Sequence, residues 1–243
     1  MCVEPTRYIP SEQRRALRKE VCFCCPVCGS PLLEYHHIIP WAKIKEHVIE
    51  NMIALCPGCH SLADNATYSK SLLYQLKKAG KNSPGWKNSI RFYSEKFYLQ
   101  VGNITFEKPH NILEIDNNPL LSIEYSEDNN IILNTVFYDS NNQEILSVRD
   151  NELSIKAEFF WDIEYNGKYL ILRKRLRKIM FEMEIYSEYL WLKKGIYQFG
   201  TSILEFFHNG FSVNTGKTCF KSIDEIVVFS SGNGIKVFSE GRF

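Results

Sequence analysis

The sequence predicts an α+β protein made of a small cysteine-rich N-terminal module with flanking helices and a mostly antiparallel β domain, a sandwich or a barrel. Two observations lead to this fold class. Six of the eight cysteines fall within 38 residues, from Cys22 to Cys59. From about residue 98 onward, apolar and polar residues alternate, which is the period of half-buried strands. We therefore expect two domains, residues 1–97 and residues 98–243.

Charge divides the chain in a similar way. The 243 residues carry 29 Lys and Arg against 28 Asp and Glu, a formal net charge of +1. This balance excludes a strongly basic chromatin-like protein and a strongly acidic disordered one. Residues 1–110 hold 15 basic and 9 acidic side chains, a net of +6, whereas residues 111–243 hold 14 and 19, a net of −5. The small total conceals two regions of opposite sign.

The sequence favours a cytoplasmic protein with no membrane partner. No stretch approaches the roughly 18 consecutive apolar residues of a membrane span, and the first residues contain no apolar run that could act as a signal peptide. Disulfides are rare in a reducing compartment, so clustered cysteines there indicate metal or redox chemistry.

The N-terminal part shows three helix signals. Residues 11–20 are rich in good helix formers, with Ser11 as the expected N-cap. The stretch Cys59–Asp64 is expected to open a second helix. Residues 69–80 predict a third helix, with Ser69 as cap and Gly80 as stop, and the segment 82–85 then breaks the chain.

The C-terminal part predicts strands joined by tight turns. Alternation predicts strands at Ile112–Ile115, Ile131–Tyr138, Tyr169–Arg173 and Ile179–Ile185. Asn tolerates the left-handed backbone that hairpin turns need. We therefore expect turns at the pairs 117–118, 129–130 and 141–142, and at Asn166-Gly167.

Two Cys-x-x-Cys pairs, Cys25/Cys28 and Cys56/Cys59, predict a structural zinc site of four thiolates. Cys22 also has ligand spacing to Cys25, but the Cys-Pro-x-Cys-Gly pattern surrounds Cys25 and Cys28. The remaining cysteines are interpreted as apolar fillers or surface thiols. About 45 residues cannot bury enough surface to fold alone, and a structural zinc contributes about 10–16 kcal/mol in small peptides.

A second set of candidate ligands lies between and after the cysteine pairs. His36 and His37 are adjacent, His60 follows Cys59, and Asp64 comes four residues later. Residues i and i+4 of a helix share one face, so His60 and Asp64 can converge on one ion. Three ligands with open positions describe a catalytic metal site.

These residues, in this order, resemble the HNH endonucleases and their ββα-metal fold. The resemblance rests on Cys25/Cys28, His36-His37, Asn51 and Cys56/Cys59-His60, and covers roughly residues 20–66.

The resemblance implies a role for each matched position. His37 would be the general base, His36 and His60 would bind a catalytic divalent metal, and Asn51 would brace the loop that orients His37. Asp64 stands where many members have His or Asn, and a carboxylate favours Mg²⁺ or Mn²⁺ over Zn²⁺ or Ni²⁺. Spacing alone leaves open which of His36 and His37 is the base.

Other polar residues near the motif are given ordinary roles. We interpret His47, His110 and His208 as surface or satisfied histidines. Glu34 could reach the site, but we interpret it as a solvated strand position.

The predicted function is therefore metal-dependent hydrolysis of phosphodiester bonds in DNA. The alternatives are a non-catalytic zinc-ribbon module that binds nucleic acid or protein, and a scaffold with a silent nuclease core. Arg14, Arg15 and Arg18 are the candidate contacts to the DNA backbone. The basic run 173–178 is interpreted as a solvated turn, although it could follow phosphates, and the β domain could recognise DNA or bind a partner protein.

Overall fold

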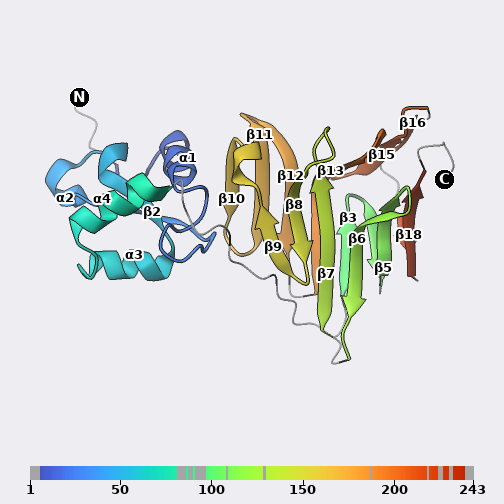
Figure 1. The fold of residues 1–243 in the computed structure, drawn as a ribbon, viewed down its shortest axis with the longest axis horizontal. Helices are drawn as coiled ribbons and strands as arrows, with labels where there is room; N and C mark the ends of the chain where they lie inside the picture. Colours follow the sequence, from blue (N-terminus) through green and yellow to red (C-terminus); the bar gives the residue numbers. More distant parts are fainter. Residues whose placement is uncertain are drawn as a thin grey trace. The chain divides into compact units, whose positions relative to one another are not determined.

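The protein, represented by a computed structural model, has two compact units. The structure describes residues 6–80, 86, 90, 97–107, 109–127, 130–186, 188–217, 219–223, 227–229 and 232–238. One unit comprises Met1–Lys87 with Asp162–Asn166, and the other comprises Asn88–Trp161 with Gly167–Phe243. Helices lie in the first unit and strands dominate the second, so the fold is α+β (Figure 1).

The first unit consists of short helices around a two-stranded sheet. Its helical elements are α1 (Ser11–Glu20), α2 (Trp41–Ile44), η1 (Ile49–Asn51), α3 (Pro57–Asp64) and α4 (Lys70–Ala79). Its strands are β1 (Glu34–His37), β2 (Met52–Leu55) and β10 (Asp162–Tyr165). Along the chain, one cysteine pair precedes β1 and the other follows β2.

The predicted helices are confirmed, with corrections at their starts. α1 has the predicted bounds, but Ser11 is its first helical residue and Pro10 takes the N-cap position, so the predicted cap is wrong. α4 begins as predicted, because the Ser69 side chain accepts a hydrogen bond from the Leu72 amide at 3.1 Å. α3 starts earlier than predicted, at Pro57. The expected break at 82–85 lies outside the described residues.

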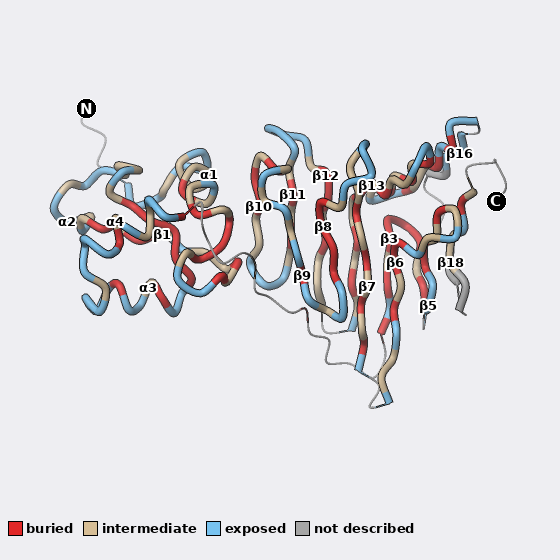
Figure 2. Tube along the Cα trace, in the orientation of Figure 1, coloured by how far each residue is buried: buried red, intermediate tan, exposed pale blue. Residues whose placement is uncertain are grey.

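The β1–β2 hairpin presents two different faces. The strands are antiparallel, with His37 opposite Met52 and His36 opposite Ile53. Side chains alternate along a strand, so Glu34 and His36 share one face while Tyr35 and His37 share the other. All four residues of β2 are buried (Figure 2), and they form one core with residues such as Leu17 and Leu73.

α4 is tied to the rest of the unit by a lysine and a glycine. Lys77 Nζ donates to the Ile49 and Met52 carbonyls, each at 2.9 Å, and also pairs with the Glu20 carboxylate. A Cβ on Gly80 would lie 2.4 Å from the Glu20 carbonyl oxygen. The end of α4 therefore approaches the end of α1 more closely than a larger residue would allow.

The second unit is a β-sandwich, which is one of the two predicted forms. Its smaller sheet has the order β18-β5-β6-β7-β8-β9, and the larger contains β11-β12-β13-β14-β15-β16, with β3 beside β13 and β4 between β3 and β17. The strands are β3 (Tyr98–Val101), β4 (Ile104–Glu107), β5 (Pro109–Ile115), β6 (Asn118–Tyr125), β7 (Ile131–Tyr138), β8 (Glu144–Arg149), β9 (Glu152–Ile155), β11 (Tyr169–Arg175), β12 (Lys178–Ile185), β13 (Tyr189–Phe199), β14 (Ser202–Phe207), β15 (Gly210–Asn214), β16 (Cys219–Ile223), β17 (Val227–Phe229) and β18 (Gly232–Val237). A short 3-10 turn, η3 (Ala157–Phe159), follows β9.

Aromatic contacts join the two sheets. Phe137 of β7 packs on Tyr197 of β13 with ring centroids 4.2 Å apart, and on Phe181 of β12 at 4.8 Å. The buried Tyr197 hydroxyl is hydrogen-bonded to Thr135 Oγ1 at 2.7 Å, which satisfies the polar end of that side chain. The core of this unit therefore lies between the sheets.

The predicted strands are confirmed, and the turns follow the asparagine signal. β7 has the predicted bounds and alternates buried and half-buried residues along its whole length. Asn117 (φ 61°) and Asn142 (φ 57°) adopt the left-handed conformation, as does Gly167 (φ 88°). Asn129 lies outside the described residues. Within the described part of the chain, no helix is long and apolar enough to cross a bilayer.

Candidate metal centres and active site

The four predicted cysteine ligands converge in the first unit. The sulfur atoms of Cys25, Cys28, Cys56 and Cys59 all lie within 4.8 Å of one another, and the Cys28 and Cys56 sulfurs are 3.5 Å apart. The sequence offered Cys22 or Cys28 as the partner of Cys25. The structure places Cys28 in the cluster.

Tight turns present these sulfurs. In the first knuckle, the Gly29 amide donates to the Cys25 carbonyl at 2.8 Å, and Gly29 has the positive φ of 78° that glycine tolerates best. In the second, Cys56 caps α3 and its sulfur accepts from the Cys59 amide at 3.5 Å. Pro57 occupies the first helical position, where its missing N–H leaves no bond unmade.

The donor set fits a tetrahedral zinc ion. Zn–S bonds of about 2.3 Å place two thiolates roughly 3.8 Å apart, which is close to the Cys28–Cys56 separation. Partial burial, with the Cys56 and Cys25 sulfurs nearby, raises the pKa of Cys28 to about 11. Burial and the same crowding raise the pKa of Cys59. A divalent cation is what would allow four such close sulfurs to lose their protons together.

A second potential ligand group comprises His36, His60 and Asp64, whose donor atoms also lie within 4.8 Å of one another. His36 Nδ1 is 3.1 Å from Asp64 Oδ1, and His60 Nε2 is 3.7 Å from Asp64 Oδ2. His36 comes from β1, while His60 and Asp64 lie one turn apart on α3. This group contains two nitrogen donors and one carboxylate, a set that binds divalent cations.

Glu34 contacts this group from the same face of β1. Its Oε2 is 2.7 Å from His60 Nδ1, which leaves His60 Nε2 on the side of Asp64. Glu34 is exposed, as the sequence interpretation held, and it also reaches the site, because its carboxylate contacts His60. The period of two along the strand could have indicated it, because Glu34 is two residues from His36.

Burial favours the uncharged form of His36. Partial burial and the His60 imidazole lower the pKa of His36, while the Asp64 carboxylate opposes that shift. At neutral pH the ring is therefore mainly uncharged, and a neutral imidazole is the form that binds a metal. Asp64 remains open to solvent, with 61% of its side chain exposed.

His37 has a different set of close neighbours from His36, because successive side chains of β1 lie on opposite faces. Its Nε2 is 3.2 Å from His47 Nδ1, and its ring meets the Trp41 ring edge-on, with centroids 5.6 Å apart. Burial, followed by the charges of His47, His36 and Arg7, lowers the pKa of His37.

The sequence interpretation of His47 as an ordinary histidine missed this contact. No spacing rule pointed to it, because the pairing of His37 with His47 arises from the fold of α2 and the loop after it.

Asn51 is hydrogen-bonded through both its main chain and its side chain. The Ile38 amide, directly after His37, donates to the Asn51 carbonyl at 2.8 Å. The Asn51 side-chain oxygen accepts a hydrogen bond from the Tyr74 hydroxyl of α4 at 2.9 Å. Asn51 therefore links the end of β1 to α4.

The three candidate DNA-binding arginines differ in their surroundings. Arg18 makes a bidentate ion pair with Asp162, with both closest oxygens 2.8 Å from its Nη2, and donates to the Tyr35 hydroxyl at 2.6 Å. Its side chain is only 11% exposed. Arg14 donates to the Tyr8 hydroxyl at 3.1 Å and lies over the Tyr8 ring, and Arg15 is half-buried on the same helix. The guanidinium of Arg18 is therefore engaged within the unit.

Comparison with known proteins identifies the segment that contains both ligand groups. The family profile described as HNH endonuclease matches residues 25–65. Residues 25–65 form an HNH endonuclease domain. Both cysteine pairs, His36, His37, Asn51, His60 and Asp64 lie in this HNH domain.

A curated relative matches a short part of the chain. The type IV methyl-directed restriction enzyme EcoKMcrA of Escherichia coli (strain K12) is 38% identical over 48 residues, which are 20% of this chain and 17% of that enzyme. The chain thus covers less than a fifth of the length of this relative. No solved structure matches the chain.

Proposed function

We propose that the chain is a metal-dependent endonuclease that hydrolyses phosphodiester bonds in DNA. The observation that carries the proposal is the presence of two separate ligand groups within one HNH domain, one of four sulfurs and one of His36, His60 and Asp64. A zinc-binding scaffold needs only the first group. The second group supplies three protein ligands, which leaves positions for water and a phosphate oxygen on a divalent ion.

The cysteine site is proposed to be structural and the histidine site catalytic. Four thiolates saturate a tetrahedral zinc, so the first site has no open position. His36, His60 and Asp64 would hold Mg²⁺ or Mn²⁺, with Zn²⁺ or Ni²⁺ as alternatives. The bound ion would neutralise negative charge on the phosphoryl group and on the leaving oxygen.

His37 is proposed to be the general base. Its imidazole takes a proton from a water molecule, and the water oxygen forms a bond to phosphorus while the bond from phosphorus to the 3′-oxygen breaks. The electron pair of that bond leaves with the 3′-oxygen, which then gains a proton from solvent. Because the pKa of His37 is lowered by burial and by His47, the ring is uncharged and able to accept a proton at neutral pH.

Asn51 and the α1 arginines have supporting roles in the proposal. Asn51 braces the residue next to His37 through the Ile38 amide. Arg14 and Arg15 remain candidates for contact with the DNA backbone, whereas Arg18 is assigned to its pair with Asp162.

The choice of DNA target is not carried over from the restriction enzyme. The similarity covers only 48 residues, 20% of this chain and 17% of that enzyme, so we take from it no preference for methylated sites. We assign target or partner recognition to the β-sandwich as a working hypothesis.

Cleavage of supercoiled plasmid tests the function. We expect the purified chain to convert plasmid DNA in the presence of Mg²⁺ or Mn²⁺, and we expect His37→Ala to lose about 10²–10⁴-fold in rate. His110→Ala, which changes an exposed histidine of the sandwich, is the matched control and should cleave like the wild type.

Two outcomes would contradict the proposal. Equal cleavage by wild type and His37→Ala would remove His37 as the base. No cleavage of any DNA or RNA substrate with any of the four metals, by protein that binds one zinc, would favour the non-catalytic zinc-ribbon alternative.

A further inference from the structure

We propose that His47 is a positioning residue for His37, holding its ring so that Nδ1 is the nitrogen that accepts the proton. The inference rests on the proposed function for its catalytic meaning, because it concerns the nitrogen that the base uses. The pairing of the two histidines rests on the structure alone.

The partner of His47 determines which ring donates in the hydrogen bond between His47 and His37. His47 Nε2 is 3.1 Å from the Thr6 carbonyl oxygen, which can only accept. His47 must therefore carry its proton on Nε2, and in the neutral ring its Nδ1 is then an acceptor. That Nδ1 is 3.2 Å from His37 Nε2, so His37 Nε2 must donate. A neutral His37 with its proton on Nε2 has its lone pair on Nδ1.

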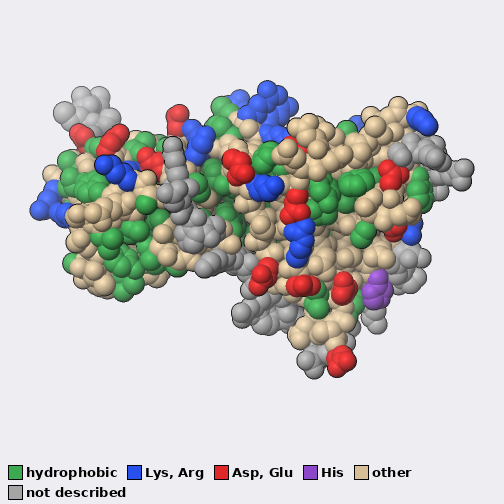
Figure 3. Space-filling view, in the orientation of Figure 1, with side chains coloured by type: hydrophobic (Ala, Val, Ile, Leu, Met, Phe, Trp, Pro, Cys, Tyr) green, Lys and Arg blue, Asp and Glu red, His purple; other side chains and the backbone are tan. Residues whose placement is uncertain are grey.

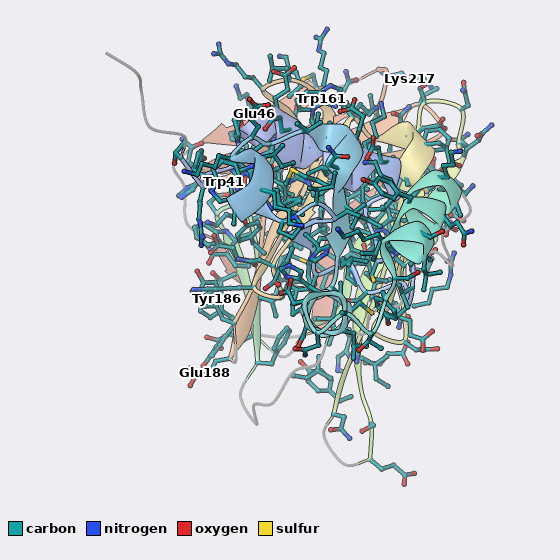
Figure 4. All side chains as sticks on the ribbon, turned by 90° about the vertical axis from the view of Figure 1, so that its left-hand side faces the viewer. Trp41, Glu46, Trp161, Tyr186, Glu188 and Lys217 are labelled. Atoms are coloured by element: carbon teal, nitrogen blue, oxygen red, sulfur yellow. The ribbon has the colours of Figure 1, made fainter. Side chains whose placement is uncertain are left out.

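His47 is itself fixed by its surroundings. Its ring stacks on Trp41 with centroids 4.5 Å apart and an angle of 29° between the planes. Gln13 Nε2 of α1 donates to the His47 carbonyl at 3.2 Å. Lys45, at the end of α2, adopts a left-handed conformation (φ 51°) and turns the chain. Figure 4 labels Trp41 and Glu46, which precede and follow Lys45 in the chain.

This arrangement suits a base that must gain charge during the reaction. When His37 accepts a proton on Nδ1, the ring becomes an imidazolium with N–H groups on both nitrogens. The Nε2–H then donates to His47 Nδ1 as a charge-assisted hydrogen bond, which is stronger than the neutral one. The same logic, a base oriented by a third group, underlies nucleophile–base–orienter triads in hydrolases.

Two substitutions distinguish the effect of the acceptor atom from the effect of the aromatic ring. His47→Phe keeps an aromatic ring against Trp41 but has no acceptor. His47→Asn places an amide oxygen near the position of Nδ1 and keeps the acceptor. We expect His47→Phe to lower kcat for plasmid cleavage about tenfold or more, with KM unchanged, and His47→Asn to retain most of the wild-type kcat.

Nitrogen-15 NMR of the histidine rings provides a readout that does not depend on activity. The full chain contains six histidines, so selective labelling gives few signals, and single substitutions assign them. At about pH 8.5, we expect both His37 and His47 to be protonated on Nε2 and bare on Nδ1.

The outcomes are distinct. A His37 ring protonated on Nδ1 overturns the pairing, as does wild-type kcat in His47→Phe or an equal loss in the two variants. Zinc content and melting temperature check that both variants fold, and the wild-type spectrum decides the pairing even where a variant does not. A wild type that cleaves nothing refutes the proposed function, while the spectrum still tests the His37–His47 hydrogen bond.

Discussion

Individual contacts decide how each imidazole of the site is presented. Glu34 holds His60 through Nδ1, and His47 holds His37 through Nε2. A carboxylate that accepts from a metal-binding histidine fixes the ring and makes the other nitrogen a better ligand. Glu34 is thus expected to act on metal binding, whereas His47 is expected to act on the base.

At this scale we predict that Glu34→Gln weakens the catalytic metal site without affecting the zinc site. Loss of the carboxylate behind a histidine ligand typically lowers metal affinity about 10–100-fold. The Mn²⁺ concentration that gives half-maximal cleavage should therefore rise by about that factor, while zinc content stays constant. Glu50→Gln, at another exposed position of the unit, is the control. An unchanged Mn²⁺ midpoint in Glu34→Gln would refute this role.

Local spacing predicted part of this site and could not predict the rest. His60 and Asp64 are one helical turn apart, and the cysteine pairs sit in knuckles, so each convergence was visible in the sequence. Glu34 and His47 join the site through contacts between β1 and α3, and between β1 and the loop after α2. The period of two along β1 places Glu34 on the face of His36, but no spacing indicates the approach of His47 to His37, which depends on how the elements pack.

At the scale of elements, a short hairpin and one helix position most of the side chains of the candidate site. β1 directs His36 toward α3 and His37 toward α2, because successive side chains of a strand point to opposite faces. α3 begins at the second cysteine knuckle and carries His60 and Asp64. The start of α3, and hence the ligand geometry, depends on the cysteine cluster.

Cys56→Ser is accordingly predicted to unfold the first unit. Cys56 is both a sulfur ligand and the cap of α3, and structural zinc contributes about 10–16 kcal/mol in small zinc peptides, as much as the whole stability of a typical domain. Circular dichroism should show lost helix, and zinc content should fall. Cys219→Ser, which changes an exposed cysteine of β16, should leave both unchanged. A fully folded, zinc-loaded Cys56→Ser would contradict the structural role of the cluster.

At the scale of the whole molecule, the chain forms two compact units. The alternation after residue 98 predicted the sandwich and several of its strands. It could not predict the parallel pairs β3 with β13, β4 with β17 and β5 with β18, because they join segments far apart in the chain. Nor could it predict that Asp162–Asn166 are counted with the first unit, where Asp162 pairs with Arg18.

The basic run predicted as a solvated turn forms the tip of the β11–β12 hairpin. Lys174, Arg175, Arg177 and Lys178 are exposed, and Leu176 between them is 67% exposed. Lys and Arg side chains gather over the end of these strands in Figure 3. The solvated position agrees with the sequence interpretation.

The two units should also respond separately to destabilisation. A Cβ on Gly195 would lie 2.4 Å from Phe206 Cζ in the sandwich core, and such overpacking costs about 1–3 kcal/mol. Calorimetry of Gly195→Ala should therefore show a lower transition for the sandwich and unchanged zinc content. Gly58→Ala, whose Cβ would meet nothing within 4 Å, is the control. A loss of zinc in Gly195→Ala would show that the units do not fold independently.

The central claim is that the HNH domain holds two metals with different duties. It is tested most directly by measuring plasmid cleavage and zinc content together in wild type and His60→Ala, over a range of Mn²⁺ concentrations. We predict that wild type binds one tight zinc and cleaves with a saturable dependence on Mn²⁺, and that His60→Ala keeps its zinc but loses cleavage. Cleavage by His60→Ala equal to that of the wild type, or loss of its zinc, would contradict the account.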